Sequence, residues 1–168
     1  MEHLWAGWRS AYVGAAGAAE PLQVNGSRGC VFCGILESGA LDEDRGIIAE
    51  GDTVVVILNA YPYTSGHLMV MPRRHVRELE ELTSEEAVEM WSTVHRAVAA
   101  LKRAYRPDGL NLGLNLGRAA GAGIPGHLHV HAVPRWLGDS NFMTAAASVR
   151  VLPESLPDSW RKLRAAWT

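Results

Sequence analysis

The chain has 168 residues and a mass of 18.2 kDa, a length that fits one domain with its own buried core. With 48% apolar and 20% charged residues it has the composition of a soluble domain, and it contains no apolar run of about 18 residues that could span a membrane. The net charge of -2 argues against binding to long nucleic acids. We therefore expect a cytoplasmic protein that binds neither membranes nor long nucleic acids, although a small anionic ligand remains compatible with this charge.

The first 29 residues differ in composition from the rest of the chain. They are rich in Ala and Gly and end in a turn-prone segment, Asn25–Gly29. Within them Trp5, Trp8 and Tyr12 are spaced for one face of a short helix that has to pack against another element. We expect residues 1–29 to be an extension and residues 30–168 to form the domain.

The domain shows strand patterns interrupted by one long helix. The capping-box sequence that begins at Thr83 and the helical spacing of the apolar residues after it predict a helix over 84–104. Strands are predicted over 46–49, 53–58, 67–71, 110–116, 127–133 and 149–152, and a last helix over 157–167. This order predicts an α+β fold with an antiparallel sheet.

Three histidines alternate with apolar residues in one predicted strand. Successive side chains of a strand point to opposite faces, so His127, His129 and His131 are expected on one face, about 7 Å apart. Burying three imidazoles without partners is unfavourable, and a functional face explains them better. Two functions fit this pattern: metal binding, or phosphoryl or nucleotidyl transfer with an imidazole nitrogen as the nucleophile.

A glycine-rich loop, Leu116–Gly126, leads directly into this strand. Loops of this kind allow backbone N–H groups to approach phosphate oxygens. Its position before the histidines favours phosphate chemistry.

Cys30 and Cys33 form the remaining motif. The βαβ context of a thioredoxin-like redox pair is missing, so the pair is either half of a zinc site that needs two further ligands, or two metal-free thiols.

Residues 127–133 resemble the signature of the histidine triad family, in which three histidines alternate with apolar residues. The resemblance covers residues 30–135, and its other motifs are the cysteine pair, Leu58-Asn59, Gly66–Val70, Arg73–Val76 and Asn115 with the glycine loop. It implies a roll around a five-stranded antiparallel sheet with one long helix and a C-terminal helix, a homodimer or larger homo-oligomer, and binding of a nucleoside phosphate.

The resemblance also implies roles for four histidines. His129 attacks the α-phosphorus and forms a covalent nucleotidyl-imidazole intermediate. His127 and His131 orient that ring, hold phosphate oxygens and assist the leaving group, and His67 supports them from behind. No cofactor is required for this chemistry.

Further positions match the nucleotide-binding residues of the family. Asn59 corresponds to the residue that holds the ribose hydroxyls, and Asn115 to the polar residue near the α-phosphate. Phe32, Ile35, Ile57 and Leu58 fall where the family encloses its purine. In the loop, Gly123, Ile124 and Gly126 correspond to phosphate-binding positions but depart from the family's frequent Gly-Gln-Ser or Gly-Gln-Thr sequence.

The segment after the triad, Pro134–Met143, resembles the bacterial subgroup that phosphorolyses diadenosine tetraphosphate. Phosphorolysis requires a site for inorganic phosphate beside His129, and Arg135, Ser140 and Asn141 are the nearest candidates. Alternatively, these residues form a polar rim that contacts the second nucleotide without selecting phosphate. Trp136 is a further expected nucleotide-binding residue. Similar bacterial proteins complete a zinc site with the histidines that match His75 and His127.

We therefore expect a diadenosine tetraphosphate phosphorylase that produces ADP and ATP through an adenylylated His129. The alternatives are a hydrolase of dinucleoside polyphosphates or nucleoside phosphoramidates, and an AMP-binding module with little turnover.

Overall fold

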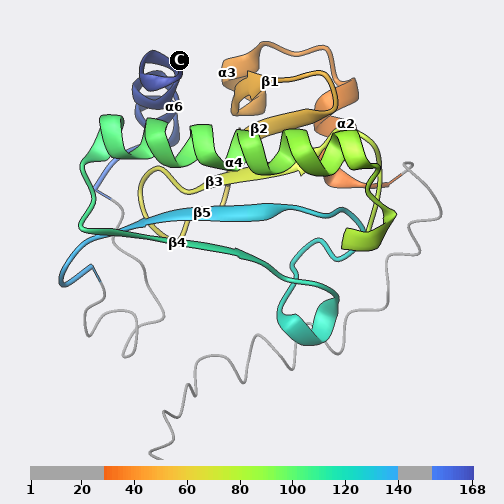
Figure 1. Cartoon of the computed structure of the whole chain (residues 1–168). Helices are drawn as coiled ribbons and strands as arrows, with labels where there is room; N and C mark the ends of the chain where they lie inside the picture. Colours follow the sequence, from red (N-terminus) through yellow and green to blue (C-terminus); the bar gives the residue numbers. More distant parts are fainter. Residues whose placement is uncertain (1–28, 140–152) are drawn as a thin grey trace, which may run out of the picture.

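A computed structural model describes residues 29–139 and 153–168 (Figure 1). Its centre is a five-stranded antiparallel sheet with the strand order β1-β2-β3-β5-β4. The strands are β1 (Ile47–Glu50), β2 (Val54–Leu58), β3 (Leu68–Pro72), β4 (Gly109–Leu114) and β5 (Val130–Arg135). The helices are α2 (Val31–Glu37), α3 (Asp42–Arg45), α4 (Ser84–Tyr105) and α6 (Leu156–Ala166), with short 3-10 turns at Leu79–Glu81 and Arg118–Ala120. The predicted fold class is confirmed.

The long helix α4 covers one face of the sheet (Figure 1). Its start is fixed by the predicted capping box, in which the Thr83 hydroxyl accepts from the Glu86 N–H and the Glu86 carboxylate accepts from the Thr83 N–H. Apolar side chains at helical spacing, among them Met90, Val94 and Leu101, pack on the sheet in the larger core cluster. This face of the sheet is therefore closed to ligands.

The opposite face carries a smaller apolar cluster formed by α2 and the alternate residues of β2 and β3. Phe32 and Cys33 of α2 pack there against Val55, Ile57 and Met69. Because strand residues alternate between faces, Val54, Val56 and Leu58 belong to the α4 side instead.

The C-terminal helix α6 lies beside the edge strand β1. The Trp160 indole N–H donates to the carbonyl of Ile47 at 2.8 Å, and the Arg164 guanidinium donates to the carbonyl of Ile48 at 2.6 Å. Leu163 is fully buried in the α4-side core. Side-chain donors thus fasten this helix to the sheet edge.

Most predicted elements lie within three residues of the observed ones. The largest shift at the start of a strand is that of the histidine strand, which begins three residues later than predicted. The ladder of β5 starts at Val130, because the Leu128 N–H donates to the Val76 carbonyl and not to a neighbouring strand. Helices α2 and α3 were not predicted. The predicted strand 149–152 and the residues Ser140 and Asn141 lie outside the described residues, as does almost all of the extension, so the division at residue 29 stays a prediction.

In the part of the chain that the structure describes, no helix is both long and apolar enough to cross a bilayer.

Candidate active site and metal centre

The three histidines alternate with core residues as predicted. Leu128, Val130 and Ala132 are buried in the α4-side core. The imidazoles lie on the other face, where His129 and His131 have ring centroids 4.8 Å apart. His127 and His129 are only 1% and 6% exposed, and His131 is half-buried. We call these three residues the histidine row.

His129 is held in one tautomer. Its Nδ1 lies 2.7 Å from the carbonyl oxygen of His127, and because a carbonyl only accepts, Nδ1 carries the proton. Nε2 therefore carries the lone pair, and among the described residues none forms a hydrogen bond with it. Burial lowers the pKa of His129, which keeps the ring neutral near pH 7. A neutral imidazole with an open Nε2 is a competent nucleophile.

His67 and His131 form a hydrogen-bonded chain whose proton positions can be followed. The Tyr63 backbone N–H donates to His67 Nδ1 at 3.2 Å, so Nδ1 is an acceptor and Nε2 carries the proton. His67 Nε2–H then donates to His131 Nδ1 at 2.9 Å, which leaves the proton of His131 on its own Nε2. His131 thus presents an N–H donor beside His129.

Asn59 supports the same tautomer of His67. Its Oδ1 accepts from the Tyr61 N–H at 2.9 Å, so the amide nitrogen is the group that lies 3.3 Å from His67 Nδ1 and donates to it. Burial, followed by the proximity of His129, lowers the pKa of His131 to about 4. His131 is therefore a neutral donor at physiological pH.

His127 differs from the other two members of the row. Its Nε2–H donates to the Pro72 carbonyl at 2.8 Å. Its Nδ1 lies 3.4 Å from the Cys30 sulfur and 3.7 Å from the Cys33 sulfur. Both ring nitrogens are thus engaged, and the expected contact of this ring with phosphate oxygens is not supported by its geometry.

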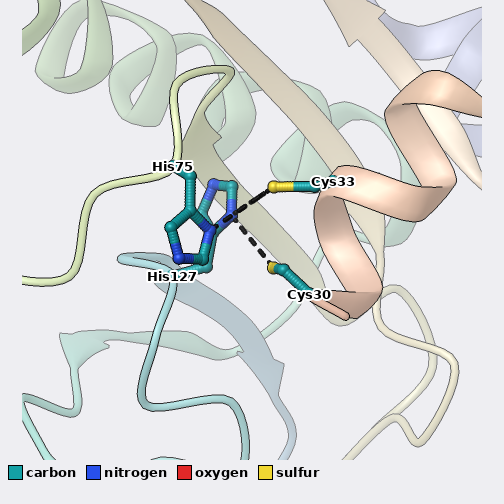
Figure 2. Close-up of side chains that lie close together, drawn as sticks. All are labelled: Cys30, Cys33, His75 and His127. Atoms are coloured by element: carbon teal, nitrogen blue, oxygen red, sulfur yellow. Dashed lines mark hydrogen bonds between the residues drawn. The ribbon is translucent and has the colours of Figure 1, made fainter. Parts of the chain in front are cut away.

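Figure 2 shows that Cys30, Cys33, His75 and His127 converge. Their four ligand atoms all lie within 4.8 Å of one another. Cys33 Sγ is 3.4 Å from His75 Nδ1. A tetrahedral zinc ion, with bonds of about 2.3 Å to sulfur and 2.0 Å to nitrogen, holds such ligands ~3.5 Å apart. The cluster therefore has the donor set and spacing of a structural zinc site.

The protonation state of this cluster depends on whether a metal is bound. Burial, with the neighbouring Cys30 as a smaller cause, raises the pKa of Cys33 to about 11. Without an ion the thiol would stay protonated, whereas a bound cation would stabilise the thiolate that serves as a zinc ligand.

The expected purine-binding residues separate into two groups. Phe32 lies edge-on to the rings of His127 and His129, at centroid distances of 5.5 and 5.2 Å. Ile35, Ile57 and Ile124 belong to the cluster that contains Phe32. Leu58 does not, because its side chain is buried on the α4 side; the expectation that it lines the purine face with Ile57 is wrong.

The glycine loop passes beside the cluster of four candidate zinc ligands. A Cβ at Gly126 would lie 3.8 Å from the His75 ring, and Gly117 and Gly121 adopt positive φ angles. Gly123 is exposed, and Asn115 is half-buried just after β4 ends. The loop therefore reaches the metal cluster shortly before the chain enters β5.

Arg135 and Trp136, by contrast, already contact other protein side chains. Arg135 forms a two-pronged pair with Asp139, at 2.6 and 2.7 Å, and donates to Asn111 Oδ1 at 2.8 Å. Trp136 lies edge-on to Tyr105. Because its guanidinium is already paired, Arg135 is a poor candidate for the phosphate site.

Sequence reasoning missed Tyr63 and the Pro72 carbonyl. The ring of Tyr63 lies 4.5 Å from that of His67 and 5.9 Å from that of His131. Its position four residues before His67, in a loop, was the one available signal. A backbone acceptor such as Pro72 leaves no trace in a side-chain pattern.

Comparison with known proteins identifies the family. The HIT domain family matches residues 41–136. An AP-4-A phosphorylase of Mycobacterium tuberculosis is 40% identical over 167 residues, which are 99% of this chain and 85% of the relative. A Zn-bound histidine triad family protein from Mycobacterium smegmatis matches with a TM-score of 0.67 and 34% identity, over 84% of this chain and 94% of the other. The chain belongs to the HIT domain family.

Proposed function

We propose that this protein is a diadenosine tetraphosphate phosphorylase that produces ADP and ATP. The observation that carries the proposal is His129, whose Nδ1 is fixed by the His127 carbonyl and whose Nε2 is left open. The similarity to an AP-4-A phosphorylase over nearly the whole chain supports this substrate.

In the first half-reaction, His129 Nε2 attacks the α-phosphorus of one adenylyl group. The new N–P bond forms while the bond between this phosphorus and the bridging oxygen breaks, and ATP leaves. The Nε2–H of His131, whose ring centroid lies 4.8 Å from that of His129, is the proposed donor for the departing oxygen. As negative charge builds up on that oxygen, the donor becomes more effective, which stabilises the transition state.

In the second half-reaction, an oxygen of inorganic phosphate attacks the same phosphorus. The N–P bond breaks, ADP forms, and His129 recovers its neutral ring. Dividing the displacement into two steps is the general advantage of a covalent intermediate. Hydrolysis would differ only in that water attacks and AMP is produced.

The purine of the adenylyl group lies, in this proposal, against Phe32, Ile35 and Ile57, which share one apolar cluster. Asn59 and Asn115 take the ribose and α-phosphate positions that the family resemblance assigns to them. The loop residues Gly123, Ile124 and Gly126 complete the phosphate side.

Zinc, when bound by Cys30, Cys33, His75 and His127, acts in this scheme as a structural ion. It links α2, which carries Phe32, to the first member of the histidine row. It thereby fixes the backbone carbonyl that orients His129. A metal-binding thiol pair also suits the reducing cytoplasm, where we place the protein.

We further propose that the protein forms a homo-oligomer. β4 is an edge strand, and its Leu112 is 48% exposed. Light scattering on the purified protein measures the assembly directly.

The decisive experiment incubates purified protein with diadenosine tetraphosphate, with and without inorganic phosphate, and resolves the products. ADP and ATP that form only with phosphate support the proposal. AMP and ATP formed in water identify a hydrolase, and nucleotide binding without turnover identifies a binding module.

A further inference from the structure

Two aromatic rings bracket the histidine row. Phe32 contacts the row at His127 and His129, and Tyr63 contacts it at the other end, at His131. The substrate proposed above also has two aromatic groups, one purine on either side of its phosphate chain. The two rings thus match the two halves of a dinucleoside polyphosphate.

Tyr63 lies where the leaving half of the substrate must pass. Its ring is nearly parallel to that of His131, at an interplanar angle of 25°. In the proposed mechanism the Nε2–H of His131 donates to the departing oxygen, because its Nδ1 is bonded to His67. The leaving nucleotide therefore departs at the end of the row that Tyr63 borders.

Tyr63 is partly exposed although its backbone is held by hydrogen bonds. The residue is 44% exposed, whereas Phe32 is buried. The Tyr63 N–H bonds to His67, and the next residue, Thr64, donates its hydroxyl to the Pro134 carbonyl at 2.8 Å. A platform that is fixed in position and partly exposed loses little conformational freedom when a flat ligand stacks on it.

The loop that carries Tyr63 is also fixed from behind. Gly66 has a φ of +81°, and a Cβ there would lie 2.5 Å from the ring of Tyr105. Tyr105 is itself anchored through its hydroxyl, which donates to Glu154 at 2.6 Å. The loop thus packs tightly against α4, which keeps Tyr63 beside the row.

From this arrangement we infer that Tyr63 is a specificity residue: its ring stacks on the purine of the leaving nucleotide. The inference rests on the proposed function, because it requires a substrate with a second base. Through this stacking, Tyr63 would make the protein prefer dinucleoside polyphosphates over mononucleoside polyphosphates.

The test compares two substrates. Diadenosine tetraphosphate has the second adenosine, whereas adenosine 5′-tetraphosphate has the same adenylyl group and phosphate number without it. Stacking of a base on an aromatic side chain corresponds to about 5- to 150-fold in binding. Tyr63→Ala should therefore lower kcat/KM for the dinucleotide about 5- to 150-fold and change it less than about 2-fold for the mononucleotide. Tyr63→Phe should keep the selectivity.

Tyr61→Ala is the matched control, because Tyr61 lies in the same loop, is 87% exposed and has no ring contact with a histidine among the described residues. It should leave both substrates unaffected. Melting temperature and zinc content show whether each variant is folded.

An equal loss with both substrates after Tyr63→Ala would overturn the inference, because the ring would then only support His67 and His131. Unchanged kinetics with both substrates would overturn it too. The ratio of kcat/KM for the dinucleotide to that for the mononucleotide can be measured with either phosphate or water as the acceptor. The corresponding ratio of affinities can be measured by binding both nucleotides to the His129→Ala protein. Failure of the proposed phosphorolysis, seen in the wild-type products, is thereby distinguished from failure of the stacking.

Discussion

The two ends of the histidine row differ in what their ring nitrogens do. At one end, both nitrogens of His127 are engaged, Nε2 by the Pro72 carbonyl and Nδ1 by the cysteine sulfurs. At the other end, His131 Nδ1 accepts from His67, and within residues 29–139 and 153–168 its Nε2 has no hydrogen-bond partner. Two histidines four residues apart thus serve different purposes in the proposed function: His127 supports the site, and His131 faces the reacting phosphate. Substitutions at each end test this division.

The largest effect is expected for the residue between the two ends. His129→Ala removes the proposed nucleophile, so turnover should fall by about 10⁴-fold or more while nucleotide binding persists. Single-turnover assays and calorimetry measure the two quantities. Near-normal turnover in this variant would show that another group attacks the phosphorus.

At the reactive end, His131→Asn should lower kcat by about 10²- to 10³-fold, because the transition state loses a positioned donor. Zinc content and melting temperature should stay close to those of the wild type. His67 contacts the reaction through His131, so His67→Gln should lower kcat by about 10- to 100-fold. A loss of zinc in either variant would contradict the division between the two ends.

At the structural end, Cys33→Ser should abolish zinc binding and lower the melting temperature. A metal-ligand loss worth about 3 kcal/mol corresponds to ~6–12 °C for a chain of this length. Elemental analysis and thermal unfolding check both effects. His95→Gln, at an exposed position of α4, is the control and should change neither. Retention of a full equivalent of zinc in Cys33→Ser would exclude the proposed cluster.

Acidification should destabilise the fold, because burial lowers the pKa of all three histidines of the row, and His131 should supply part of this effect. The pKa of His131 is about 4 in the folded protein and about 6.5 in the unfolded chain, so the unfolded state takes up the proton first. This contribution to stability is complete above about pH 6.5 and is lost as the pH falls towards 4. Urea unfolding at about pH 7.5 and 5 measures the loss of free energy of unfolding, and this loss should be smaller in His131→Asn. An unchanged loss in this variant would show that other groups dominate the pH dependence.

The smallest effect is expected outside the row. Arg135→Gln should change the KM for phosphate less than about 2-fold, because the guanidinium is already paired with Asp139. The partly exposed pair should contribute no more than about 1 kcal/mol to stability. A large rise in the phosphate KM would restore Arg135 to the phosphate site.

The sequence predicted those features that depend on alternation and spacing. The two faces of the histidine row and the capping box of α4 follow from periodicity, and the structure has both. The convergence of the four metal ligands was expected from the family resemblance alone, since His75 and His127 are far from the cysteines in the chain.

Other features depend on tertiary contacts and could not be predicted in this way. α2 has seven residues, no side-chain cap and two buried side chains, so it gives little local signal. The hydrogen bond that holds His127 Nε2 is accepted by a backbone carbonyl, that of Pro72. The error at Leu58 had a simpler cause, because two successive strand residues, Ile57 and Leu58, cannot lie on the same face.

The attachment of α6 to β1 has a consequence for solubility. The edge of a sheet offers unpaired backbone groups to strands of other molecules, which promotes aggregation. Two carbonyls of β1 already accept from Trp160 and Arg164. Addition of strands is thereby hindered on this side of the sheet, and association through β4 would stop at a closed pair and would not extend into a fibre. Loss of the last helix would remove this protection.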